Sequence, residues 1–271
     1  MNRAPIGIFD SGLGGLTVAR AIYQALPFDS TVYFGDTARV PYGPKSPATV
    51  RRYSLEITDW LVRQGVKAIV VGCNTSTAHA LEALQAATTV PVIGVIEPGA
   101  RAAVRATRPG RPIGVIGTAG TIQSRAYERA IRAIAPGVEV AAAACPLFVP
   151  LVEEGWFDHE ATRLVAEVYL RPLLDRGIGT LVLGCTHYPL LKPLLGRVAG
   201  ADLTLIDSAE ETGLELKQLL TERDLLAPPD GGGRIFHRFA VSDDPERFRT
   251  VGSRFLGERL AAAEVVTLGG H

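Results

Sequence analysis

Short apolar runs alternate with longer amphipathic stretches along the first third of this chain. The apolar runs lie at 6–9, 31–34, 68–71 and 92–96. Their length and continuity are typical of strands that are buried on both faces of a sheet. The stretches with apolar residues at helical spacing lie at 16–26, 48–64 and 77–86. Strands that alternate with helices in this way predict a parallel sheet.

The same order begins again in the second half of the chain. The segment PIGVIGTAGT at 112–121 echoes PIGIFDSG at 5–12, and the proline-rich stretch between 97 and 111 is interpreted as a domain boundary. Further strands are expected at 140–143, 180–183 and 236–241, helices at about 159–175 and 245–260, and a polar Pro/Gly segment at 228–233. We therefore predict an α/β fold of two similar domains. Each has a mainly parallel sheet flanked by helices, and the active site lies in the cleft between them.

Two cysteines occupy matching places in this pattern. Cys73 and Cys185 each follow an apolar strand and a glycine, and each precedes small polar residues and a predicted helix. Ligands bind at the carboxyl ends of parallel strands, and a helix N-terminus favours the reactive thiolate. A lone cysteine is more often a packing residue, which is our interpretation of Cys145, but two in matching contexts indicate a site.

Composition and charge exclude several classes of partner. The chain has 271 residues and equal numbers of acidic and basic side chains, so nothing suggests nucleic-acid binding. The longest apolar run, at 140–152, is short for a membrane span and contains two prolines. The N-terminus lacks the apolar core of a signal peptide, and three cysteines do not form a disulfide framework. We expect a cytoplasmic protein with reduced thiols.

Two thiols that face one cleft suggest proton transfer by two opposed bases. One base removes a proton from one face of a carbon centre and the other returns a proton to the opposite face. A free thiol has a pKa of about 8.5, so each needs a partner that takes or holds its proton. Asp10 could serve Cys73, and His187 could serve Cys185. The side chains that could hold carboxylates and an amine are Ser11, Asn74, Thr75 and Thr186.

Several motifs in the same order resemble the glutamate racemases, in the aspartate/glutamate racemase family. They are DSG at 10–12, GDTAR at 35–39, PYG at 41–43, CNT at 73–75, PLFVPLVEEG at 146–155, GCTHYP at 184–189 and the tail from 241 to 257. Gly72 and Ser76 depart from the alanines common in the family. The resemblance implies interconversion of L- and D-glutamate without cofactor or metal, which supplies D-glutamate for bacterial peptidoglycan. It also implies that glutamate is the small-molecule partner, and we expect a homodimer.

The resemblance assigns roles residue by residue. Cys73 and Cys185 would be the proton donors and acceptors, assisted by Asp10, His187 and Glu153. The substrate-binding residues would be Asp10, Ser11, Tyr42, Gly43, Asn74, Thr75, Thr186 and His187, with Thr118 and Thr121 as weaker candidates. A return of the chain to the first domain near Asp207 is also implied. The predicted domains are then 1–97 plus 208–271, carrying Asp10 and Cys73, and 98–207, carrying Cys185 and His187.

Other interpretations remain open from the sequence. Asp10 is also a typical helix cap, and Glu153 could be a solvated charge. Gly12 and Gly14 after a strand, with Asp36 after the next strand, partly match a dinucleotide fingerprint, although Thr17 replaces its third glycine. A metal site formed by Cys73, Cys185 and His187 is conceivable by ligand type. The functional alternatives are a racemase for another amino acid such as aspartate, or a non-catalytic binding protein of the gyrase-inhibitor type.

Overall fold

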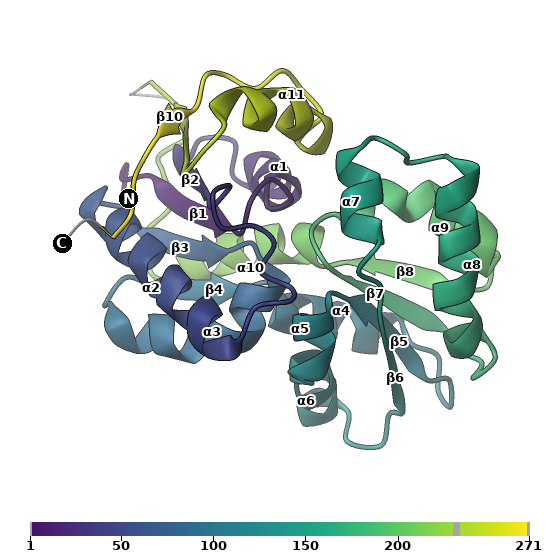
Figure 1. Cartoon of the computed structure of the whole chain (residues 1–271). Coiled ribbons are helices and arrows are strands. Elements are labelled where there is room, and N and C mark those ends of the chain that lie inside the picture. Colours follow the sequence, from purple (N-terminus) through teal and green to yellow (C-terminus); the bar gives the residue numbers. More distant parts are fainter. Residues whose placement is uncertain (1, 230–233, 270–271) are drawn as a thin grey trace.

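The computed structural model describes residues 2–229 and 234–269, and their strands form two separate parallel sheets (Figure 1). The strands are β1 (Ile6–Asp10), β2 (Thr31–Gly35), β3 (Ala68–Val71), β4 (Val92–Gly94), β5 (Ile113–Gly117), β6 (Val140–Ala144), β7 (Thr180–Gly184), β8 (Thr204–Asp207), β9 (His237–Val241) and β10 (Glu264–Val265). The larger sheet has the order β10-β9-β2-β1-β3-β4 and the smaller one β6-β5-β7-β8. The predicted fold class is confirmed. Part of the Pro/Gly segment expected at 228–233 lies outside the described residues.

Helices cover both faces of each sheet. They are α1 (Leu16–Ala25), α2 (Pro47–Arg63), α3 (Asn74–Ala87), α4 (Ile96–Ala106), α5 (Ala119–Gln123), α6 (Ala126–Ile134), α7 (Phe148–Glu153), α8 (Glu160–Leu174), η1 (Tyr188–Leu191), α9 (Lys192–Ala199), α10 (Ser208–Glu222) and α11 (Pro245–Leu256). Alternate side chains of β1 show how this arises, because Ile8 belongs to the core beneath α1 and Phe9 to the core beneath α2 and α3. None of these helices is both long and apolar enough to cross a membrane.

The sequence repeat corresponds to equivalent strands of the two sheets. β1 lies between β2 and β3, and β5 lies between β6 and β7. In each sheet the chain therefore reverses its direction of winding beside the central strand, which is where ligands of open α/β sheets bind. Cys73 follows β3 and Cys185 follows β7, so both cysteines stand at such a reversal point.

Some element ends differ from the sequence-based expectation. α3 begins three residues before the expected start at 77, because the Cys73 side chain caps it. The proline-rich stretch after 97 is largely the helix α4, in which Pro98 stands in the first turn, where no backbone donor is required. α11 ends at Leu256 and not at 260, since Gly257 takes the left-handed conformation with φ of 83°.

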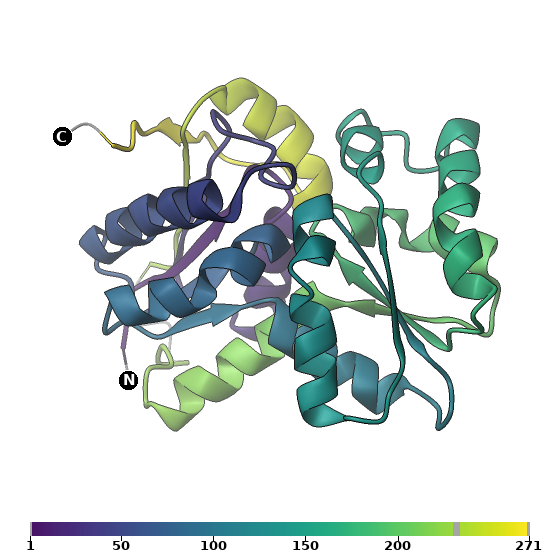
Figure 2. The same cartoon turned by 60° about the horizontal axis from the view of Figure 1, so that its bottom comes forward.

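The chain crosses back to the larger sheet after β8. α10 starts at Ser208, directly after Asp207, and packs against α1 and α4. Gly213 permits the close approach to α1, since a Cβ there would lie 2.9 Å from the carbonyl oxygen of Ala21. Figure 2 shows α10 lying along the unit that contains the larger sheet.

Candidate active site

Cys73 is the N-cap residue of α3 and is almost completely buried, with 5% of its surface exposed. Its sulfur accepts a hydrogen bond from the Ser76 amide at 3.4 Å and lies 3.5 Å from the Ser11 hydroxyl oxygen. Burial and the negative charge of Asp10 raise the pKa of this thiol to about 11. The expectation that the helix N-terminus would favour a thiolate is therefore wrong for Cys73, because burial outweighs the effect of the helix.

Asp10 is the last residue of β1 and lies beside Cys73. One carboxylate oxygen, Oδ2, accepts a hydrogen bond from the Gly12 amide at 2.9 Å. The other, Oδ1, is buried and has no well-aligned hydrogen-bond partner in the described residues. Burial raises the pKa of Asp10, although the nearby His187 acts in the opposite direction. Asp10 thus keeps one buried acceptor atom that a cationic or N–H group could satisfy.

Cys185, His187 and Glu153 form a chain of contacts in the second unit. The Cys185 sulfur lies 3.9 Å from His187 Nδ1, and His187 Nε2 lies 3.0 Å from Glu153 Oε1. Burial lowers the pKa of His187, but its contacts with Cys185 and Glu153 outweigh that effect and raise it to about 10. Glu153 is kept ionised, because contact with His187 and then with Arg247 lowers its pKa against the effect of burial.

The local backbone around Cys185 differs from that around Cys73. η1 begins at Tyr188 and has His187, not Cys185, as its N-cap residue. Pro189 stands in the first turn, as the sequence predicts. His187 therefore turns back toward Cys185 from the start of the short helix, and this explains why the two side chains meet.

The loop after β1 contacts the second unit directly. A Cβ on Gly14 would overlap Thr186 Oγ1 and lie 2.5 Å from His187 Nδ1, so only glycine fits between them. The Thr17 hydroxyl donates a hydrogen bond to the Thr186 carbonyl at 3.2 Å. The Asp10 loop of the larger sheet and the Cys185 loop of the smaller sheet therefore lie against each other.

The start of α3 makes a second set of contacts with the smaller sheet. The hydroxyl oxygens of Thr75, Thr118 and Thr121 lie 2.9 to 3.3 Å from one another. The Tyr127 hydroxyl donates a hydrogen bond to Asn74 Oδ1 at 2.7 Å, while Asn74 Nδ2 is buried without a partner in the described residues. The residues that follow Cys73 thus reach across to the unit that carries Cys185, and Asn74 keeps one donor free.

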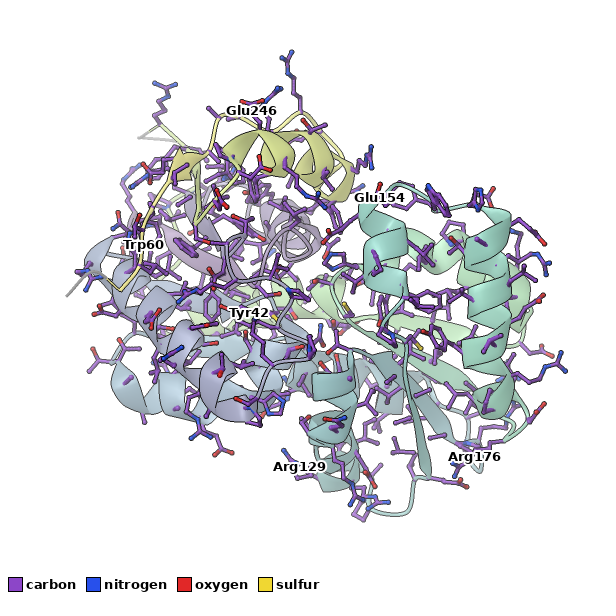
Figure 3. The ribbon with its side chains drawn as sticks, in the orientation of Figure 1. Tyr42, Trp60, Arg129, Glu154, Arg176 and Glu246 are labelled. Atoms are coloured by element: carbon purple, nitrogen blue, oxygen red, sulfur yellow. The ribbon has the colours of Figure 1, made fainter. Side chains whose placement is uncertain are left out.

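Tyr42 and Gly43 lie on the loop before α2. In Figure 3 Tyr42 lies in the unit of the larger sheet, on the side toward the smaller sheet. Its ring is buried and its hydroxyl donates a hydrogen bond to Asp36, so this hydroxyl already has a protein partner. The Gly43 carbonyl accepts a hydrogen bond from the Gly120 amide at 2.9 Å. Gly43 therefore joins the two units, whereas the Tyr42 hydroxyl contacts Asp36 within its own unit.

Several residues at the site were not identified from the sequence. Arg247 and Arg254 of α11 contact Glu153 through its carboxylate and its backbone carbonyl, at 3.0 and 3.1 Å. The ring of Phe255 meets the His187 ring edge to face at 5.0 Å. Each lies 68 or more positions along the sequence from the residue that it contacts, and although all three fall within the tail motif at 241–257, nothing in that segment marks them as site residues. Cys145 is buried, as expected of a packing residue.

A small cavity opens next to these groups. It has a volume of about 190 Å³ and is lined by Gly12, Leu13, Thr37, Val40, Glu153, Asp243, Asp244, Arg247 and Phe248. Among the residues that the structure describes, no three His, Cys, Asp or Glu side chains form a group that could hold a metal ion, and Cys73, Cys185 and His187 therefore do not form one.

Comparisons with known proteins agree with this geometry. A family model described as Asp/Glu/Hydantoin racemase matches residues 6–212. A glutamate racemase of Geobacter metallireducens is 57% identical over 263 residues, which are 97% of this chain and 96% of that protein. The crystal structure of glutamate racemase isoform RacE1 from Bacillus anthracis has a TM-score of 0.92 at 42% identity, covering 98% of each chain. The glutamate racemase of Francisella tularensis in complex with D-glutamate also has a TM-score of 0.92, at 39% identity over the whole of both chains. The chain therefore belongs to the Asp/Glu/Hydantoin racemase family.

Proposed function

We propose that this protein interconverts L- and D-glutamate by direct proton transfer at Cα, with no added cofactor or metal. One observation carries the proposal. Two buried cysteines stand at the reversal points of two similar parallel sheets, and the loops around them bring the two units together. Glutamate is favoured as substrate over aspartate because relatives that cover almost the whole chain are glutamate racemases.

The two thiols have surroundings that suit opposite roles. The raised pKa of Cys73 keeps it a thiol near neutral pH, ready to give a proton. Cys185 lies beside His187, whose raised pKa lets the imidazole hold a proton next to the sulfur. The resemblance to the glutamate racemases assigns proton removal from L-glutamate to Cys185 and proton delivery to the opposite face to Cys73. The reverse reaction exchanges these roles, as microscopic reversibility requires.

The unpaired polar atoms fit the charged groups of an amino acid. Asp10 Oδ1 can accept a hydrogen bond from the substrate ammonium group, and Asn74 Nδ2 can donate one to a carboxylate. Further polar groups for binding the substrate come from Ser11, Thr75, Thr186 and the loop that contains Gly43. Thr118 and Thr121 join this set through Thr75. His187 and Glu153 assist Cys185.

The domain division and the assembly belong to the same proposal. The domains are residues 1–97 plus 208–271 and residues 98–207. Support for this division comes from β1 to β4, β9 and β10 sharing one sheet, while β5 to β8 share the other. The homodimer and the role in peptidoglycan synthesis remain predictions from the resemblance, and the cytoplasmic location remains a prediction from the cysteine count and the N-terminal sequence. Light scattering of the purified protein measures the assembly.

A direct assay tests the function. The protein is dialysed exhaustively with a chelator and incubated separately with L-glutamate and L-aspartate, with no cofactor added, while optical rotation is followed. We expect rotation to decay to zero with glutamate and to change far more slowly with aspartate. A site shaped for one chain length leaves polar groups unpaired when the distal carboxylate is too short. Equal turnover of both acids contradicts the assigned substrate, and activity that returns only with added metal contradicts the cofactor-free mechanism.

A further inference from the structure

We infer that Arg247 is a positioning residue for the Cys185 half of the reaction, holding Glu153 in place against His187 from the other unit of the protein. This inference rests on the proposed function. Arg247 lies in α11, whose chain neighbours β9 and β10 belong to the larger sheet, whereas Glu153, His187 and Cys185 belong to the unit of the smaller sheet.

The contacts of Glu153 show how the positioning works. Its two carboxylate oxygens have different partners, since Oε1 lies 3.0 Å from His187 Nε2 and Oε2 lies 3.0 Å from Arg247 Nη2. A carboxylate held at both oxygens cannot rotate away from the imidazole. Because His187 Nδ1 faces the Cys185 sulfur, the orientation of Glu153 determines how the imidazole meets the thiol.

The surroundings of α11 strengthen the assignment. Arg254, two turns further along α11, donates a hydrogen bond to the Glu153 backbone carbonyl, and the next residue, Phe255, packs on the His187 ring. Figure 1 shows the end of α11 directed at α7, and Figure 3 shows Glu154 at the end of α7 that faces α11. Glu153 is partly buried, with 17% of its side chain exposed, whereas Arg247 is 53% exposed, so solvent screens the arginine end of the ion pair and the contact acts mainly by orienting the carboxylate.

The positioning of Glu153 by Arg247 and the positive charge of Arg247 have opposite effects on the pKa of His187, so an experiment can separate them. The charged or titratable groups that face Glu153 and His187 are Cys185, Asp10, Arg247 and Arg254, with Asp243 and Asp244 lining the adjacent cavity. Removing a positive charge from this set would by itself raise the pKa of His187. Releasing Glu153 from its fixed orientation would lower it, because the hydrogen bond to Nε2 weakens.

The first experiment follows the His187 ring by NMR of the ¹⁵N-histidine-labelled protein, with His187→Asn used to identify its signal. We expect the His187 pKa to fall in Arg247→Gln and to recover partly in Arg247→Lys. The control is Arg249→Gln on the same helix, since Arg249 pairs with Glu246 at the surface. A pKa that rises or stays unchanged in Arg247→Gln overturns the inference. This measurement needs no substrate, so it stands even if the proposed function fails.

The second experiment measures catalysis from each face. Elimination of HCl from 3-chloroglutamate needs one Cα proton, which goes to a thiolate, while the Cα electron pair forms the double bond and chloride leaves from Cβ. In Arg247→Gln, proton removal from the L-enantiomer should slow by about tenfold, with the D-enantiomer unaffected, and Arg247→Lys should restore part of the loss. Equal slowing of both enantiomers, or no slowing in a folded variant, overturns the inference.

Discussion

The hydroxyl oxygens of Thr75 and Thr118 lie 2.9 Å apart, although Thr75 lies in the first turn of α3 in the larger sheet's unit and Thr118 follows β5 of the smaller sheet. Thr121 lies within hydrogen-bond distance of both. This cluster holds the two units against each other beside Cys73. It gives Thr118 and Thr121, the weaker candidates from the sequence, a defined place at the edge of the site.

We predict an energetic coupling between Thr75 and Thr118. Thr75→Val, Thr118→Val and the double variant should show a non-additive loss of stability, with a coupling of about 0.5–1.5 kcal/mol, the usual net value of a hydrogen bond. Urea unfolding of the four proteins measures it. Strictly additive losses would mean that the two hydroxyls do not interact in solution.

The two cysteine variants should divide the reaction by face. Cys73→Ser and Cys185→Ser should each lose nearly all racemisation, because a serine hydroxyl is a much poorer proton acceptor than a thiol near neutral pH. With 3-chloroglutamate, Cys73→Ser should still process the L-enantiomer and Cys185→Ser the D-enantiomer. If each variant loses both enantiomers equally, the two cysteines do not act as opposed bases.

Asp10→Asn and His187→Asn should show weaker forms of the same split. Asp10 lies by Cys73 and His187 by Cys185, and each tunes its thiol without carrying the Cα proton. We therefore expect a larger loss with the D-enantiomer in Asp10→Asn and with the L-enantiomer in His187→Asn. Initial rates of chloride release from each enantiomer check this. The opposite pairing of variant and enantiomer would reverse the assignment of faces.

Cys73 should make stability fall at alkaline pH. Its pKa is raised in the folded protein from an ordinary value of 9.0 to about 11, so the unfolded chain ionises first. The stability that Cys73 contributes is complete below about pH 9 and is lost as pH rises through about 11, a total of about 3 kcal/mol. Urea unfolding from pH 8 to 11 should show a shallower decline in Cys73→Ser. Parallel declines in the two proteins would show that the thiol is not shifted.

Gly14→Ala should damage the Cys185 half of the site. The added Cβ would overlap Thr186 Oγ1 and press on the His187 ring, and such overpacking typically costs about 1–3 kcal/mol. We expect lower stability, and in the elimination assay a greater loss of initial rate with the L-enantiomer of 3-chloroglutamate than with the D-enantiomer. The matched control is Gly137→Ala, where no described atom lies within 4 Å of the added Cβ. A Gly14→Ala protein that behaves like this control would contradict the tight contact.

The parts of the fold and site that follow from local pattern could be predicted. Cys73 and Cys185 were identifiable because an apolar strand, a glycine and polar residues are adjacent in the sequence. Asp10 and His187 follow strands in the same way. The parallel sheets followed from the regular alternation of the same segments with helices.

Other features depend on the meeting of distant segments. Arg247 reaches Glu153 across 94 positions, and Thr17 reaches Thr186 across 169. Neither pair leaves a local signal, since an arginine in an amphipathic helix is usually a solvated charge. The expectation that Cys73 would be a thiolate is wrong for a related reason. The helix N-terminus is visible in the sequence, but the burial that outweighs it depends on the folded surroundings of Cys73, where Asp10 and Ser11 come from a distant part of the chain.

The closed arrangement of the thiols also determines how glutamate arrives. Cys73 and Cys185 are only 5% and 6% exposed, and the threonine cluster holds the units together beside them. We expect an amino acid to reach the sulfurs only when these contacts separate, and its product to leave by the same movement. The frequency of opening therefore sets an upper limit on turnover, however fast the proton moves.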